Sequence, residues 1–199
     1  MEAGLVLTTG LGLAVAAGLN AFIPLLVAGL LVRFDLYSFG EPYDMLGSTP
    51  ALVILVVLLV VEILADKVPA VDSVNDAIQT FIRPASGAVL FAAAASGVGQ
   101  DWAQALALIL GLVTAAGVHA TKATARPVIN VATAGVGGPV VSTVEDGVSA
   151  GLALTALLAP LVAALILLGL AFGVVWLLRR RRATRRAGAG TDPRATSAG

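Results

Sequence analysis

The feature that most constrains this chain is an uncharged apolar run over residues 4–32. Its roughly 29 residues exceed the ~20 that a helix needs to cross the hydrocarbon core of a bilayer. Asn20 and Pro24 interrupt the run near its middle. Because proline lacks an N–H and clashes with the preceding turn, we expect a break there that frees carbonyl groups at membrane depth. The break either lines a site or is a structural kink. A small-residue face for close helix packing is formed by Gly10, Ala14 and Gly18.

Composition excludes an ordinary soluble enzyme. Of the 199 residues, 58% are hydrophobic and only 12% are charged, whereas soluble domains are nearer half apolar and a quarter charged. The net charge of zero hides an asymmetry, because residues 179–199 hold seven of the 12 basic and one of the 12 acidic residues. This basic tail predicts a C-terminus in the cytoplasm. Without cysteine, disulfides, thiolate metal sites and a Cys nucleophile are excluded.

Three further apolar stretches are candidates for crossings: residues 51–65, 103–121 and 151–178. The loop over residues 34–50 is acidic and holds no basic residue, which predicts the non-cytoplasmic side. Four crossings then place both termini in the cytoplasm. We expect residues 1–178 to form one all-α membrane domain and residues 179–199 to form a disordered basic tail.

Two segments between these crossings, residues 69–98 and 124–150, are different in kind. Pro69 and Pro84 bound an amphipathic helix of about 15 residues, or roughly 22 Å, which is too short to span. The apolar stretch that follows this helix, residues 85–98, is also too short to span. We therefore expect each segment to enter the membrane and return to the same side as a re-entrant hairpin. The alternatives are an interfacial helix followed by a short span, or six transmembrane helices.

An internal repeat supports two related hairpins. Residues 65–89 laid over residues 120–144 give 7 identities in 25, which assigns the repeat units to residues 51–98 and 103–150. The scarce residue types among the matches are Lys67/Lys122, Asn75/Asn130 and Pro84/Pro139. With one crossing between them, the hairpins would enter from opposite faces with proline tips near the midplane. Inverted repeats of this kind build the central site of many secondary transporters.

The charges inside the apolar body are candidate site residues, because a charge at the bilayer centre costs ~2.5–3.5 kcal/mol and is retained for a reason. The expected substrate-binding residues are Arg83, Lys67, Lys122, Arg126, Asn75, Asn130 and Asn20. The expected proton-coupling acids are Asp72, Asp76, Glu145, Asp146, Glu62 and Asp66. Lys67, Lys122 and Arg126 could instead snorkel to the interface. His119 is interpreted as a packed interior residue, and Ser142 with Glu145 matches a capping box at a helix start.

Five motifs hold most of these polar residues: Asn20-Ala-Phe-Ile-Pro24, Ala65-Asp-Lys-Val-Pro-Ala-Val-Asp-Ser-Val-Asn-Asp76, Arg83-Pro-Ala-Ser-Gly87, His119-Ala-Thr-Lys-Ala-Thr-Ala-Arg-Pro127 and Ser142-Thr-Val-Glu-Asp146. On them, over about residues 4–175, the chain resembles an uncharacterised family of bacterial integral membrane proteins classed only as a domain of unknown function. The resemblance implies a multi-pass plasma-membrane protein and no activity. The expected architecture also looks like that of small transporters of polyprenyl-phosphate lipid carriers, by analogy alone.

The first functional hypothesis is a transporter for a small anionic or lipid-phosphate substrate, bound between the hairpin tips near the bilayer midplane, with or without coupling to protons. The alternatives are a membrane-embedded enzyme acting on a lipid and a non-catalytic scaffold. The expected partners are membrane lipids and the substrate, with a possible homodimer and without nucleic acid. We expect no cofactor or metal, because the chain holds no phosphate-binding Gly-Lys-Ser/Thr string and no HExxH-type motif.

Overall fold

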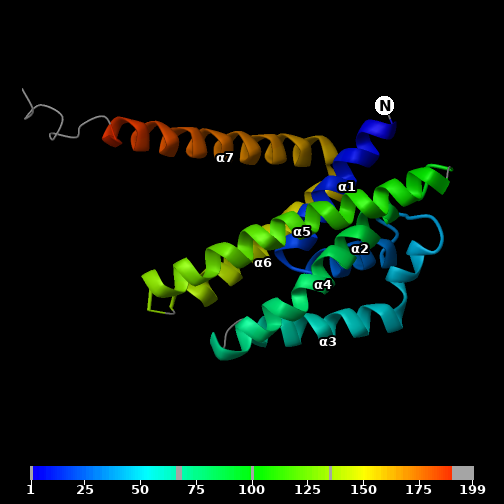
Figure 1. Ribbon diagram of the computed structural model, residues 1–199. Helices are drawn as coiled ribbons and strands as arrows, with labels where there is room; N and C mark the ends of the chain where they lie inside the picture. Colours follow the sequence, from blue (N-terminus) through cyan, green and yellow to red (C-terminus); the bar gives the residue numbers. More distant parts are fainter. Residues whose placement is uncertain (1, 66–68, 100, 135, 190–199) are drawn as a thin grey trace, which may run out of the picture. The chain divides into compact units, whose positions relative to one another are not determined.

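The computed structural model describes residues 2–65, 69–99, 101–134 and 136–189, and within these ranges it holds helices and no strands (Figure 1). The elements are α1 (Glu2–Leu19), α2 (Phe22–Arg33), the 3₁₀ helix η1 (Tyr43–Gly47), α3 (Thr49–Ala65), α4 (Pro69–Ala94), α5 (Asp101–Ala132), α6 (Gly137–Leu158) and α7 (Pro160–Ala189). The chain divides into two units, residues 1–163 and residues 164–199. The predicted all-α class is confirmed.

Among the residues that the structure describes, three helices are long and apolar enough to cross a membrane: Val74–Ala94, Asp101–Ala132 and Gly137–Leu158. Shorter apolar helices are Ala3–Leu19, Phe22–Arg33 and Thr49–Ala65. The exposed surface of the helices is apolar too, and most of the large hydrophobic side chains of α3 are exposed. A surface of this kind is unsuited to water, so the helical architecture is that of a membrane protein.

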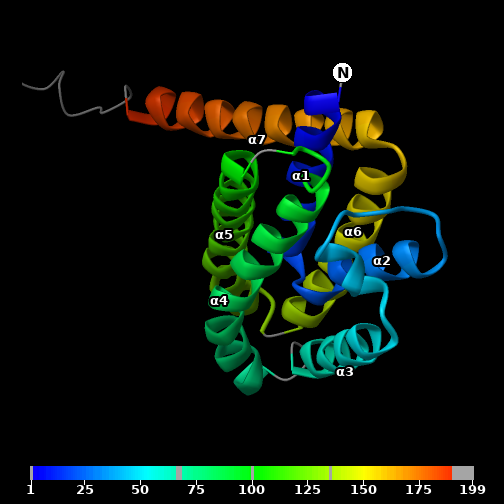
Figure 2. The ribbon, with the colours of Figure 1, turned by 90° about the vertical axis from the view of Figure 1, so that its right-hand side faces the viewer.

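Helix α1 is a central helix of the first unit. In Figure 2 it lies between the α4–α5 pair and α6, and it packs against all three. Leu13, Ala14 and Ala17 on α1 are fully buried. The predicted small-residue face is confirmed, because a Cβ added to Gly10 would contact the ring of Phe91.

Helices α4 and α5 approach most closely where each has a glycine. A Cβ on Gly87 would lie 2.7 Å from the carbonyl oxygen of Gly111. We expect Gly87→Ala to lower the free energy of unfolding by about 1–3 kcal/mol, because the added methyl overpacks this contact. Gly117→Ala is the matched control, since a Cβ on the exposed Gly117 meets nothing within 4 Å. Thermal unfolding in detergent measures both variants, and equal midpoints would contradict the prediction.

The two prolines matched by the internal repeat, Pro84 and Pro139, lie in different helical contexts. Helix α4 continues through Pro84, so the predicted helix end and hairpin tip at this proline are wrong. An interior proline removes one backbone hydrogen bond, and packing against α1 and α5 keeps α4 helical. Pro139, its partner in the repeat, lies in the first turn of α6, where a missing N–H costs nothing. The two prolines therefore do not occupy equivalent places.

The acidic loop lies beside the turn between α4 and α5. The backbone N–H of Gly40 donates to Ser96 Oγ at 2.7 Å, and Tyr43 contacts Gln104. In the predicted arrangement this loop is outside, whereas the end of the re-entrant segment 69–98 is inside. Both segments lie at one end of the bundle, so their predicted placement on opposite membrane faces is wrong.

The end of the chain also differs from expectation. As predicted, Pro160 interrupts the last apolar stretch, because α6 ends at Leu158 and α7 begins at Pro160. Helix α7 then continues to Ala189, so residues 179–189 are helical and not part of a disordered tail. Residues 190–199 lie outside the described residues.

Candidate functional site

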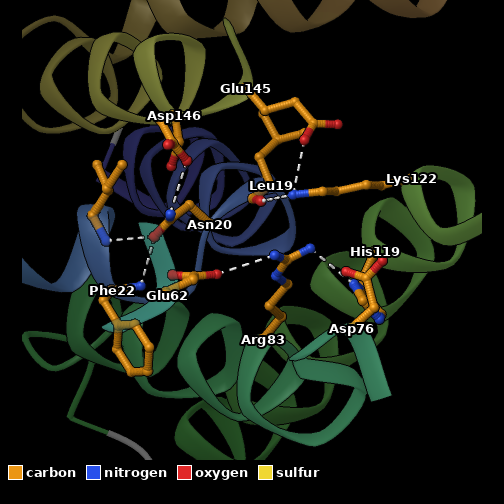
Figure 3. Close-up of polar contacts among 12 residues, drawn as sticks. Leu19, Asn20, Phe22, Glu62, Asp76, Arg83, His119, Lys122, Glu145 and Asp146 are labelled. Atoms are coloured by element: carbon orange, nitrogen blue, oxygen red, sulfur yellow. Dashed lines mark hydrogen bonds and ion pairs between the residues drawn. The ribbon is translucent and has the colours of Figure 1, made fainter. Parts of the chain in front are cut away.

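The apolar run breaks at Asn20, as the sequence predicts (Figure 3). The Asn20 side chain is buried, with 1% exposed, and its Oδ1 accepts hydrogen bonds from the backbone N–H groups of Phe22 at 3.0 Å and Ile23 at 2.9 Å. In a continuous helix, the N–H of Ile23 would bond to the carbonyl of Leu19. The Asn20 side chain takes that donor, so the Leu19 carbonyl is available to another group.

That group is Lys122, on α5. Its Nζ donates to the Leu19 carbonyl oxygen at 3.0 Å and lies 2.8 Å from Glu145 Oε2 on α6 (Figure 3). The negative end of the α1 dipole points at the same place and favours a cation there. Two unlike acceptors, a backbone carbonyl and a carboxylate, therefore hold one ammonium group inside the bundle.

Arg126 follows Lys122 by one helical turn and extends the ion pairs. Its Nη2 lies 3.7 Å from Glu145 Oε2, and its Nη1 lies 3.5 Å from Asp76 Oδ2 on α4. Lys122 is 5% exposed and Arg126 is 4% exposed. The snorkelling interpretation is therefore wrong for both residues, because their side chains turn inward to acids.

Arg83 lies in the middle of α4 and is fully buried, with 0% exposed. Its Nη2 donates to Glu62 Oε1 on α3 at 3.0 Å, and its Nη1 donates to His119 Nδ1 on α5 at 3.1 Å. A guanidinium has no acceptor, so His119 Nδ1 must be unprotonated. The ring proton is then on Nε2, which donates to Thr80 Oγ1 at 3.0 Å. Thr80 in turn donates to the Asp76 carbonyl. His119 thus binds Arg83, a role that the interpretation as a packed residue missed.

Helix α6 is attached to the break by two polar contacts. Asn20 Nδ2 donates to Asp146 Oδ1 at 2.9 Å, and Ser149 Oγ donates to the Ala16 carbonyl at 2.9 Å. Glu145 and Asp146 lie inside α6, eight and nine residues after its first residue. The predicted capping box at Ser142 is therefore wrong, because α6 begins at Gly137.

We refer to the side chains that these contacts connect as the polar network. Its members are Asn20, Glu62, Asp76, Arg83, His119, Lys122, Arg126, Glu145 and Asp146. They come from α3, α4, α5, α6 and the break after α1. Desolvating an ion costs several kcal/mol unless a partner compensates it, so each buried cation stabilises the fold only while it is paired.

A groove between α1, α5 and α6 includes part of the polar network. It has a volume of about 320 Å³, and the Lys122–Glu145 pair forms part of its lining. The residues that line it are Leu19, Val118, Thr121, Lys122, Ala125 and Glu145. Most of this lining is apolar, so the groove offers one charged end and apolar walls.

The remaining predicted site residues are not members of the polar network as defined here. Asn75 is half-buried on α4, beside Asp76, and Asn130 packs against Gly138 at the start of α6. Asp66 and Lys67 lie outside the described residues, and the side chain of Asp72 is not described. Within the described part of the chain, no three His, Asp or Glu side chains gather as a metal site would require.

Comparison with known families agrees with the resemblance on the five motifs. A family model described as "Domain of unknown function (DUF4126)" matches residues 7–180. No curated protein and no solved structure matches the chain.

Proposed function

Since the chain belongs to the DUF4126 family of unknown function, we propose from the geometry of its polar network that it is a proton-coupled membrane transporter. Its substrate carries an anionic group, either as a small anion or as a lipid phosphate. Lys122 and Arg126 bind this group, and Glu145 couples its binding to a proton. The basic C-terminal segment favours a cytoplasmic C-terminus in the plasma membrane.

One observation carries this proposal: a helix broken inside the bundle presents its last carbonyl to a buried ion pair at the end of a groove. Secondary transporters commonly build their sites from discontinuous helices whose free backbone groups and dipoles face the substrate or coupling ion. Here the Leu19 carbonyl, Lys122 and Glu145 meet in this way. A structural kink alone would need neither the lysine nor the groove.

The ion pairs supply the coupling. In the structure, Glu145 Oε2 forms ion pairs with both Lys122 and Arg126. A substrate anion must therefore compete with this carboxylate for the same two cations. Protonation of Glu145 removes the competing charge, so the anion and a proton bind together. Loss of the proton restores the carboxylate, which displaces the anion. The neighbouring acids keep other partners, because Asp146 accepts a hydrogen bond from Asn20 and Asp76 pairs with Arg126.

Reconstitution in phosphatidylcholine vesicles with an imposed pH gradient tests the proposal. The probes are radiolabelled inorganic phosphate, radiolabelled acetate and NBD-labelled phosphatidic acid. We expect gradient-dependent movement of at least one probe. Lys122→Ala should reduce that movement about 10- to 100-fold, because it removes a charge-assisted contact with the anion.

Arg33→Ala is the control, because Arg33 is an exposed cation at the end of α2. It should move the same probe at the wild-type rate. If no probe moves, or if Lys122→Ala matches Arg33→Ala, the transporter proposal is wrong.

A further inference from the structure

The Lys122–Glu145 pair lies well inside the two helices that carry it. Lys122 is ten residues from the end of α5, and Glu145 is eight residues from the start of α6. At 1.5 Å per residue, these positions are about 15 Å and 12 Å from the connection between the helices. Both helices are long and apolar enough to cross a membrane. Exposed apolar side chains lie between the pair and this connection as well: Val128, Val131, Val140 and Val144. The helix surface is therefore apolar on both sides of the pair, which suits the hydrocarbon layer and not the water interface.

The groove opens through the flank of the bundle. Its rim residues Thr121 and Ala125 are exposed, while Leu19 and Val118 form apolar walls. The helix faces beside the rim are apolar as well, and Val128, three residues after Ala125, is 69% exposed. In a bilayer such a flank contacts acyl chains. A ligand that approaches from this direction comes from the lipid phase.

We propose that the anionic group bound at Lys122 is the headgroup phosphate of a membrane lipid, which enters this groove sideways. This inference rests on the proposed function and narrows its substrate class. A water-soluble anion would have to cross hydrocarbon to reach this opening, which an ion does only at high cost. A lipid phosphate avoids that cost, because its chain stays in the bilayer while its headgroup enters.

Size and charge fit the same ligand. The groove of about 320 Å³ equals the volume of roughly ten water molecules, enough for a phosphate and the first atoms of its chain. Leu19, Val118 and Ala125 contact that chain. A phosphate monoester carries nearly two negative charges at neutral pH, and two cations, Lys122 and Arg126, converge on the oxygen of Glu145 that it replaces.

The test blocks the groove without altering the charges. Ala125→Trp fills the exposed rim, and Ala120→Trp is the matched control on an exposed part of α5 that does not line the groove. Full-length wild-type protein and both variants are placed in phosphatidylcholine vesicles. The probes are NBD-phosphatidic acid, NBD-phosphatidylcholine and radiolabelled inorganic phosphate. Lipid movement is measured by dithionite quenching.

We expect movement of NBD-phosphatidic acid alone, reduced at least about tenfold by Ala125→Trp and unchanged by Ala120→Trp. Thr121→Trp, at the same rim, should repeat the loss and serves if Ala125→Trp does not fold. Movement of inorganic phosphate without NBD-phosphatidic acid overturns the lipid inference and leaves the transporter proposal standing. Equal movement of both NBD-lipids overturns headgroup recognition, and insensitivity to both rim variants overturns lateral entry. If none of these probes moves, and the radiolabelled acetate of the first experiment does not move either, both proposals are wrong.

Discussion

Replacing Glu62 by Ala is expected to lower the free energy of unfolding by about 3–5 kcal/mol, because it leaves the Arg83 charge buried without this carboxylate. The side chains of Arg83 and Glu62 are 0% and 1% exposed, and Arg83 Nη2 lies 3.0 Å from Glu62 Oε1. At this burial, water cannot replace the lost partner. His119 cannot replace it either, because its neutral ring accepts one hydrogen bond and carries no charge.

The double variant Glu62→Leu/Arg83→Met separates a missing partner from a missing side chain. It removes both charges and keeps much of the apolar volume, so it should recover most of the stability that Glu62→Ala loses. Glu41→Ala, in the exposed loop, is the control and should change stability little. Thermal unfolding in detergent, followed by tryptophan fluorescence, measures all three. A double variant as unstable as Glu62→Ala would show that packing, and not the unpaired charge, dominates.

Sequence patterns predicted the features that depend on near neighbours. The break at Asn20 could be predicted because a proline four residues later removes a backbone donor. The close packing of α1 could be predicted because small residues recur at helical spacing. The family could be predicted because motifs such as His119-Ala-Thr-Lys-Ala-Thr-Ala-Arg-Pro127 are specific.

Features that depend on distant residues could not be predicted in the same way. Lys122 binds the carbonyl of Leu19, 103 residues away, and a free carbonyl has no signature in the side-chain sequence. His119 meets Arg83 across the α4–α5 contact, so a lone histidine in an apolar stretch gave no signal. Most of the predicted charged residues do belong to the polar network, but their pairing required the fold.

The wrong predictions share a physical cause. Proline and capping rules describe an isolated helix, whereas packing on neighbouring helices decides a buried one. Pro84 lies inside α4, where tertiary contacts offset the one lost hydrogen bond. Ser142 and Glu145 fit a capping box by spacing, but Glu145 instead pairs with Lys122 within α6. The re-entrant hairpins predicted from these rules did not count as crossings. The prediction therefore assigned the acidic loop and the end of segment 69–98 to opposite membrane faces.

Glu145→Gln is expected to strengthen anion binding at least about tenfold. In the wild-type protein, the Glu145 carboxylate pairs with Lys122 and Arg126, and an anion must compete with it for both cations. The glutamine amide has the same shape and carries no charge, so the variant leaves both cations to the anion. It also removes the carboxylate that we propose to carry the coupled proton.

The measurement is a titration of NBD-phosphatidic acid against detergent-solubilised protein at about pH 8, above the second ionisation of a phosphate monoester near pH 6. Glu41→Gln, an exposed acid outside the polar network, should bind the probe as the wild type does. In phosphatidylcholine vesicles, movement by Glu145→Gln should no longer depend on the imposed pH gradient. A Glu145→Gln variant that binds no more tightly than the wild type would show that this carboxylate does not compete with the anion for Lys122 and Arg126.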